Sequence, residues 1–174
     1  MMNQVIEAML HRRSCRSYKP EQVREDALQE ILLAGTYAAS GMGRQSGKIV
    51  VVQDKDTIEQ LRAMNAAVMG NPNSDPVYGA PTVCVVLADP DVSTWQEDGS
   101  LILGNLMLAA STLGVASCWI HRAQQEFDSP EGKALLEKWG IPTRYRGVGH
   151  CILGYAAADL PAAKPRKADY ILRV

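Results

Sequence analysis

Near the N-terminus lies a basic cluster made up of Arg12, Arg13, Ser14 and Arg16. The planar guanidinium group of arginine donates two parallel charged hydrogen bonds to phosphate oxygens, and a serine hydroxyl adds a short neutral donor. The same cations would also balance the partial negative charge at the end of a helix. The basic cluster therefore predicts either a phosphate site or a solvated helix end.

A second candidate is the glycine-rich loop over residues 41–47, which follows Ser40 and carries Gln45. It comes after a predicted helix and opens a predicted strand, whereas a dinucleotide-binding G-x-G motif follows a strand and opens a helix. A P-loop is excluded because no glycine stands five residues before Gly47, and Ile49 stands where that motif needs Ser or Thr. The loop is either a plain connection or a flexible segment whose backbone N–H groups approach a flat ligand.

A third candidate is the stretch Cys118-Trp-Ile-His-Arg122, where polar groups directly follow an apolar strand. This order suits a ring system with a polar edge, although a lone tryptophan is more often a core residue and a lone histidine a surface residue. The sequence contains no nucleophile elbow, no local Cys-His motif and no acidic pair at a diagnostic spacing. Chemistry at such a site would therefore have to come from a cofactor.

The composition is that of an ordinary globular protein, with 174 residues, 47% of them hydrophobic and 21% charged. The net charge of −1 creates no broad field, so we expect neither nucleic acid nor a membrane as a partner. The four cysteines include no C-x-x-C pair and the three histidines lack zinc-site spacing, so we expect a reduced, cytoplasmic protein without a metal. The uncharged stretch 101–120 is as long as a membrane span, but its glycines and polar residues favour a buried helix and strand.

Hydrophobic periodicity predicts helices that alternate with short buried strands. The predicted helices are one before the arginines and others over residues 24–39, 56–69, 100–113 and 131–139. The predicted strands cover residues 48–53, 82–88, 115–120 and 150–155, the first of them buried on both faces. This pattern indicates a single α/β or α+β domain over residues 1–174. Residues 159–174 form a C-terminal extension with too little periodicity to pack alone, which we expect to dock on a partner subunit.

Several segments of the chain occur in an order that is typical of one protein family. They are Arg12-Arg-Ser-Cys-Arg-Ser-Tyr18, Ala39-Ser-Gly-Met-Gly-Arg-Gln45, Gly79-Ala-Pro81, Asp98 before Asn105, Leu113-Gly to Cys118-Trp-Ile, and Gly149-His-Cys-Ile-Leu-Gly-Tyr155. In this order the chain resembles the nitroreductase family of FMN-dependent oxidoreductases over nearly its whole length. The ordered set carries the resemblance, rather than any single motif.

The resemblance implies an α+β fold in which a central mixed or antiparallel sheet is wrapped by helices. It also implies an intertwined homodimer with FMN sites at the subunit interface. Residues that match the segments around the flavin phosphate and ribityl chain are Arg12, Arg13, Ser14, Arg16, Arg166 and Lys167. Residues that match the loop reaching the flavin from the other subunit are Ser40, Gly41, Met42 and Gln45. The stretch that matches the one along the ring near N5 runs from Trp119 through Ile120 and His121 to Arg122, and Asn65 matches a contact to the pyrimidine edge.

The resemblance further implies a two-step ping-pong reaction. NADH or NADPH reduces the flavin at N5, and a small nitroaromatic or quinone acceptor then takes the electrons, so no side chain is expected to act as a catalytic acid or base. Gly43 and Ser46-Gly47 stand where many members have Asn and Pro-Trp, which makes this pocket wall smaller and more mobile and leaves the acceptor open. The alternative is a flavin-binding or flavin-sensing protein without significant turnover.

Overall fold

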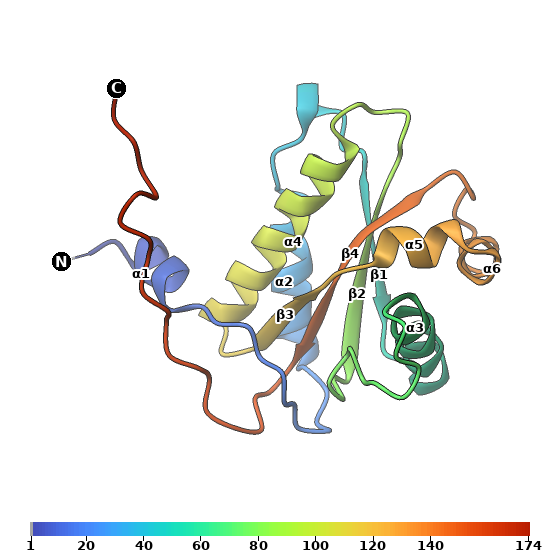
Figure 1. Cartoon of the computed structure of the whole chain (residues 1–174), viewed down its shortest axis with the longest axis horizontal. Helices are drawn as coiled ribbons and strands as arrows, with labels where there is room; N and C mark the ends of the chain where they lie inside the picture. The colour runs from blue at the N-terminus through green and yellow to red at the C-terminus, as the bar shows by residue number, and fades with distance from the viewer. Residues whose placement is uncertain (1) are drawn as a thin grey trace.

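The computed structural model describes residues 2–174 and is drawn in Figure 1. Its helices are α1 (Gln4–His11), α2 (Glu25–Thr36), the short 3-10 helix η1 (Gly41–Gly43), α3 (Lys55–Val68), α4 (Trp95–Thr112), α5 (Ala123–Asp128) and α6 (Pro130–Lys138). Its strands are β1 (Gly47–Val52), β2 (Thr82–Ala88), β3 (Ala116–Ile120) and β4 (Arg146–Gly154). The elements therefore follow the predicted alternation of helices and strands.

The four strands form one antiparallel sheet in the order β1-β2-β4-β3. The central strand β2 is buried along its whole length, as predicted. The prediction that residues 48–53 are buried on both faces is wrong, because β1 is an edge strand on which Lys48 and Val51 are exposed. A continuous apolar run predicts a strand covered on both faces, but β1 lies at the edge of an antiparallel sheet, where helices cover it only in part.

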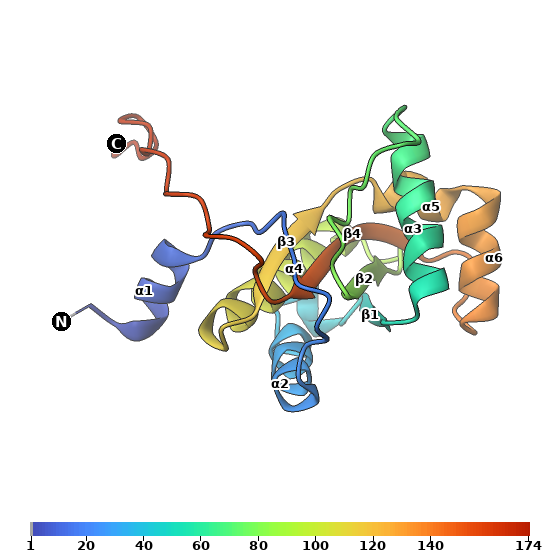
Figure 2. The same cartoon turned by 90° about the horizontal axis from the view of Figure 1, so that it is seen from below.

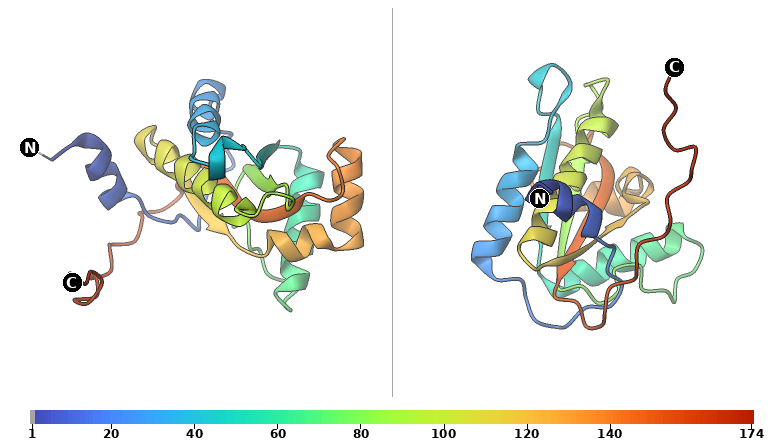
Figure 3. Two further views of the ribbon diagram at one scale, coloured as in Figure 1. Left: turned by 90° about the horizontal axis from the view of Figure 1, so that it is seen from above. Right: turned by 90° about the vertical axis from the view of Figure 1, so that its left-hand side faces the viewer.

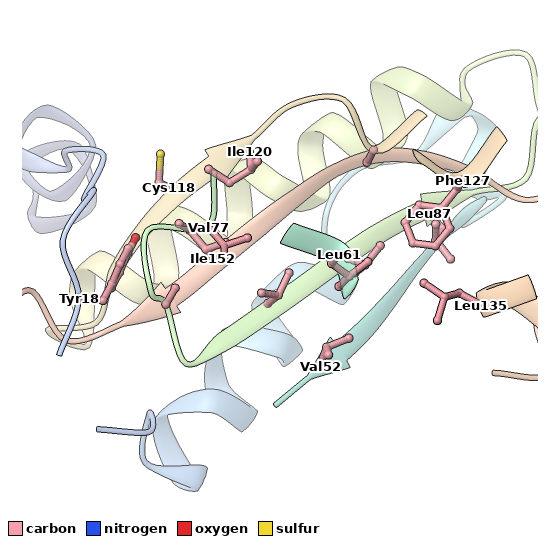
Figure 4. Packing of buried hydrophobic residues seen from close by; sticks show 14 of the residues in the cluster. Tyr18, Val52, Leu61, Val77, Leu87, Cys118, Ile120, Phe127, Leu135 and Ile152 are labelled. Atoms are coloured by element: carbon pink, nitrogen blue, oxygen red, sulfur yellow. The ribbon is translucent and has the colours of Figure 1, made fainter. Parts of the chain in front are cut away.

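Helices cover both faces of the sheet, as Figure 2 shows. Successive side chains of a strand point to opposite faces, so Val83, Val85 and Leu87 of β2 join the core on the side of α3, α5 and α6. Figure 4 shows part of this cluster, with Leu87 beside Phe127. Cys84 and Val86 join the core under α2 and α4. The expected α+β fold, a central antiparallel sheet wrapped by helices, is therefore confirmed.

Three differences from the predicted elements lie near the candidate site. Helix α5, directly after β3, was not predicted, because six residues are too few to show helical periodicity. Helix α4 begins at Trp95 rather than at residue 100, since its first turn is polar and carries no apolar pattern. Strand β4 begins at Arg146 rather than at residue 150, because glycines interrupt its first half.

Helix α1 and the C-terminal tail extend away from the sheet on the same side of the molecule, as Figures 1 and 3 show. Helix α1 has no buried residue, and its apolar side chains Val5, Ile6, Met9 and Leu10 are 48–55% exposed. Residues 157–174 are all exposed. An amphipathic helix in water normally covers its apolar stripe, so this part of the chain presents a large uncovered apolar surface.

Within residues 2–174 no helix combines the length and the hydropathy that crossing a bilayer requires. Over the same range, no three potential metal-ligating side chains come together in one group.

Candidate functional site

The basic cluster lies on an extended segment that is fixed to the sheet. This segment leaves α1 at Arg12, whose backbone N–H still donates to the Ala8 carbonyl. Ser14 then pairs in parallel with Ser117 of β3, where the Cys15 N–H donates to the Ser117 carbonyl at 2.9 Å. These backbone contacts hold the arginine side chains at the sheet edge next to β3, rather than on a mobile terminus.

All four residues of the basic cluster line one cavity of about 620 Å³, together with Arg166 and other tail residues. The Nη1 atom of Arg12 is buried and has no hydrogen-bond partner within residues 2–174. A buried charged donor without a partner is costly, and a phosphate oxygen would supply the missing acceptor. The residues of this cavity therefore fit a phosphate group.

Arg13 has a different local role from Arg12. Its Nη1 atom donates to the carbonyls of Leu10 and Arg12, each at 2.7 Å. These contacts satisfy carbonyl groups that the end of α1 leaves without intrahelical partners. Nη1 of Arg13 therefore serves the end of the helix, which was the alternative to a phosphate site. The predicted contact of Arg13 to a phosphate would use its remaining N–H groups.

A second cavity, of about 440 Å³, shares Arg16 with the first. It is lined by Trp119 and Ile120 at the end of β3 and by His121 and Arg122, which directly follow the strand. The indole of Trp119 packs over Gly149 of β4, where an added Cβ would lie 2.7 Å from the indole nitrogen. The structure thus brings the predicted phosphate-binding and ring-binding residues of one chain to two adjoining cavities.

Asn65 is placed differently from its predicted role. Its side chain is only 1% exposed, and its amide nitrogen donates to the His121 carbonyl at 2.7 Å. Its amide oxygen accepts from Arg122 Nε at 3.0 Å. A direct contact to a flavin would require the amide to leave these partners, and that contact stays a prediction.

The loop that was expected to reach the flavin lines a third cavity, of about 340 Å³, through Ser40 and Gln45. In Figure 1 this loop, with η1, lies at the top of the molecule, away from α1. Met42 of the loop is 81% exposed, and its φ of 52° lies in the left-handed region. Within one chain this loop therefore does not meet the basic cluster. Lys167 lies on the exposed tail.

Asp98 fastens both ends of this loop, a role that the sequence did not indicate. Its carboxylate accepts from the Gly41 N–H at 2.9 Å and from the Ser46 hydroxyl at 2.6 Å. Burial disfavours its ionised form, but the hydrogen bonds from Ser46 and Gly41 outweigh burial, so the pKa of Asp98 lies below its usual value. Gly41 is required here, because a Cβ would lie 2.2 Å from the Thr94 hydroxyl.

Comparison with known proteins identifies the family. The model of the nitroreductase family matches residues 9–155. A relative from Archaeoglobus fulgidus, named for NADH dehydrogenase or NAD(P)H nitroreductase activity, is 30% identical over 159 residues, which cover 88% of this chain and 86% of the relative. An FMN reductase [NAD(P)H] from Bacillus subtilis is 26% identical over 187 residues, which cover 95% of this chain and 70% of the relative.

Solved structures agree with this result. A nitroreductase with bound FMN from Bacteroides fragilis matches with a TM-score of 0.91 and 32% identity, covering 99% of this chain and 100% of that chain. A nitroreductase with bound FMN from Desulfitobacterium hafniense matches with a TM-score of 0.89 and 28% identity, with both chains covered completely, at 100%. From its sequence and its fold, the chain belongs to the nitroreductase family.

Proposed function

We propose that the protein is an FMN-dependent oxidoreductase that passes electrons from NADH or NADPH to a small organic acceptor of the nitroaromatic or quinone type. The observation that carries this proposal is the cavity lined by Arg12, Arg13, Arg16 and Arg166, in which Arg12 also has a buried Nη1 without a hydrogen-bond partner within residues 2–174. Support comes from relatives over nearly the whole chain whose structures contain FMN. The names of curated relatives include NAD(P)H, which supports a reduced nicotinamide as the electron donor.

At the phosphate end, the basic cluster would hold the FMN phosphate against the edge of β3. Arg12 and Arg16 supply charged donors from the segment that is fixed to the sheet, and Ser14 adds a hydroxyl. Arg166 and Lys167 of the tail would add positive charge on the open side of the same group. Charges from two segments that lie far apart in the sequence would thus converge on one phosphate.

At the ring end, the flavin would lie along Trp119, Ile120 and His121 in the cavity that shares Arg16 with the phosphate site. Ser40, Gly41, Met42 and Gln45 would approach the ring from a second copy of the chain, because in one copy their loop lines a separate cavity. The site is then complete only in a homodimer. The uncovered apolar face of α1 and the exposed tail would supply part of that interface.

When bound, FMN would supply hydride and electron transfer between a reduced nicotinamide and the acceptor. The chain fixes the phosphate, forms one wall along the ring and places cations where negative charge develops. No acid or base from the protein is needed for either half-reaction. Donor and acceptor would use the same opening in turn, which gives ping-pong kinetics.

The proposal is tested by adding FMN to the purified protein and separating it from free flavin. The protein is expected to retain a visible flavin absorption band and then to oxidise NADH or NADPH when a nitroaromatic or a quinone is supplied. A protein that retains no flavin under these conditions would overturn the proposal. A protein that retains flavin without turnover would instead be a flavin-binding or flavin-sensing protein.

A further inference from the structure

A buried polar network lies directly behind the end of β3. Its members are Asn65 of α3, Glu126 of α5 and His150 of β4, each only 1% exposed. Glu126 belongs to the short helix α5, which begins immediately after the cavity-lining residue Arg122. Polar and ionisable side chains are seldom buried so completely unless they are paired, so the contacts within this network need an explanation.

The contacts form a continuous chain from the core to the cavity wall. His150 Nε2 lies 3.0 Å and 3.1 Å from the two carboxylate oxygens of Glu126. The same carboxylate accepts a short hydrogen bond from the amide nitrogen of Asn65. The amide oxygen of Asn65 accepts from Arg122 Nε at 3.0 Å. Glu126 is thus linked to Arg122 through a single amide group.

The orientation of that amide is dictated by its neighbours. An ionised carboxylate only accepts hydrogen bonds and a guanidinium group only donates them. The NH₂ of Asn65 must therefore face Glu126, and its oxygen must face Arg122. The His121 carbonyl, which also accepts from this NH₂, imposes the same orientation, and the carboxylate of Glu126 adds a charged acceptor that holds the amide, and with it Arg122, in place.

The charges of the network point to Arg122 as the cation that balances Glu126. His150 Nδ1 is buried and has no hydrogen-bond partner within residues 2–174. A neutral imidazole with its proton on Nε2 leaves only a lone pair unsatisfied at Nδ1, whereas an imidazolium would leave a buried N–H without an acceptor, which is the rarer situation. The positive charge that faces Glu126 through Asn65 is then that of Arg122.

Arg122 itself is held in an unusual conformation. Its φ of 81° lies in the left-handed region, which a residue with a side chain adopts at some cost. Among the described contacts only its Nε is engaged, by Asn65. Its two Nη groups are therefore free to donate toward the cavity that Arg122 lines together with Arg16 and Trp119.

We infer that the guanidinium group of Arg122 is the cation that faces the reduced flavin ring, and that Glu126 positions this group through Asn65. This inference rests on the proposed function, because the cavity is taken to hold the ring of FMN. In that setting Arg122 stabilises the negative charge of the reduced ring. Asn65 and Glu126 act on Arg122 as positioning residues through the hydrogen bonds described above.

The test is a double-mutant cycle on the FMN-loaded protein with Glu126→Gln, Arg122→Gln and the double variant. The readouts are the FMN dissociation constant and the midpoint potential of the bound flavin. Arg122→Gln is expected to weaken binding of reduced FMN about tenfold more than binding of oxidised FMN, because one charged hydrogen bond is lost. For a two-electron couple that difference lowers the potential by about 30 mV.

Two results distinguish a positioning role of Glu126 from the simple loss of a negative charge. They are the direction in which Glu126→Gln changes the potential and whether its effect adds to that of Arg122→Gln. If Glu126 positions Arg122, Glu126→Gln lowers the potential by a similar amount, and the double variant falls no further than Arg122→Gln alone. If Glu126 acts only as a nearby negative charge, its removal raises the potential, which would overturn the inference. Additive effects of the two substitutions would overturn it as well.

Two further variants keep the test decisive. Glu137→Gln makes the same change at an exposed position of α6 and is expected to leave both readouts unchanged. If Glu126→Gln does not fold, Asn65→Ser breaks the link to Arg122, keeps the Glu126–His150 pair and is expected to lower the potential in the same way. An unchanged potential in Asn65→Ser would contradict the inference. Failure of the wild-type protein to bind FMN would instead contradict the proposed function.

Discussion

Arg12 and Arg16 have different surroundings from the other arginine of the cluster. Arg13 uses Nη1 to cap α1, whereas a buried nitrogen of Arg12 has no acceptor within residues 2–174. Arg16 lines both adjoining cavities and so connects the phosphate end of the proposed site with its ring end. Among the arginines of the basic cluster, these two are therefore the ones on which a bound phosphate would depend most.

Replacing both Arg12 and Arg16 with Ala is expected to abolish retention of FMN. Charged hydrogen bonds contribute about 1.5–3 kcal/mol each, so loss of two raises the dissociation constant roughly 10²–10⁴-fold. Quenching of flavin fluorescence on titration measures this change. Arg24→Ala, at an exposed arginine that pairs with Asp26, serves as the matched control. Full flavin occupancy in the double variant would show that the phosphate lies elsewhere.

The sequence predicts the roles of some residues of the site but not the hydrogen-bond partners of others. The basic cluster could be recognised because its chemistry is local, with every donor within five consecutive residues. The partners of Asn65 could not, since Glu126 and His121 are distant in sequence and meet it only through packing. The role of Asp98 was hidden for the same reason, because 57 residues separate it from Gly41.

At the scale of elements, Asp98 at the start of α4 holds the loop between α2 and β1 in place. Because the folded-state pKa of Asp98 is lowered, its contribution to stability is fully present above the unfolded value of about 4 and is lost as the pH falls through the folded value. The carboxylate must be ionised to accept from both Gly41 and Ser46. The loop should therefore loosen in acid.

Asp98→Asn is expected to lower the free energy of unfolding by about 1.5–3 kcal/mol at neutral pH, the usual contribution of hydrogen bonds to a charged group. The difference from wild type should shrink below about pH 4, where the carboxylate becomes protonated in the unfolded chain, and vanish as the pH falls through the lowered pKa of the folded protein. Chemical denaturation at several pH values measures both effects. Asp91→Asn removes an exposed carboxylate and should change stability little. If the difference in free energy of unfolding between Asp98→Asn and wild type stays constant down to the lowest pH, the ionised carboxylate of Asp98 does not hold the loop.

Most elements could be predicted because their apolar residues recur with helical or strand periodicity. This held for α2 and α3, which each bury one face, and for β2, which is buried on both faces. It failed for α5, whose position is fixed by a buried network and by Phe127 rather than by any repeating pattern. Strand directions followed only from the structure, since periodicity is the same for parallel and antiparallel neighbours.

At the scale of the whole molecule, the uncovered apolar face of α1 is the surface that the proposed homodimer would bury. Ile6→Asp combined with Leu10→Asp is expected to prevent dimerisation, because both side chains lie on this exposed apolar stripe. Light scattering after size exclusion should show the mass of a dimer for wild type and of a monomer for the double variant. The monomer should also lose FMN, since loop residues 40–45 would no longer reach the site.

Val68→Asp places the same charge on another exposed apolar side chain, on α3, which Figure 2 shows far from α1. This control should remain dimeric. A wild-type protein that is monomeric yet binds FMN tightly would contradict the shared site. The residues alone do not predict this arrangement, because within one copy of the fold the 40–45 loop and the arginines line separate cavities.

The central claim is that bound flavin takes hydride from a reduced nicotinamide, and one measurement tests it directly. The FMN-loaded protein is mixed rapidly with NADH, and separately with NADPH, in the absence of oxygen while the visible flavin band is followed. We predict rapid bleaching with at least one of the two nicotinamides, and return of the band when a nitroaromatic or quinone is added. A flavin that is bound but stays oxidised with both nicotinamides would contradict the account.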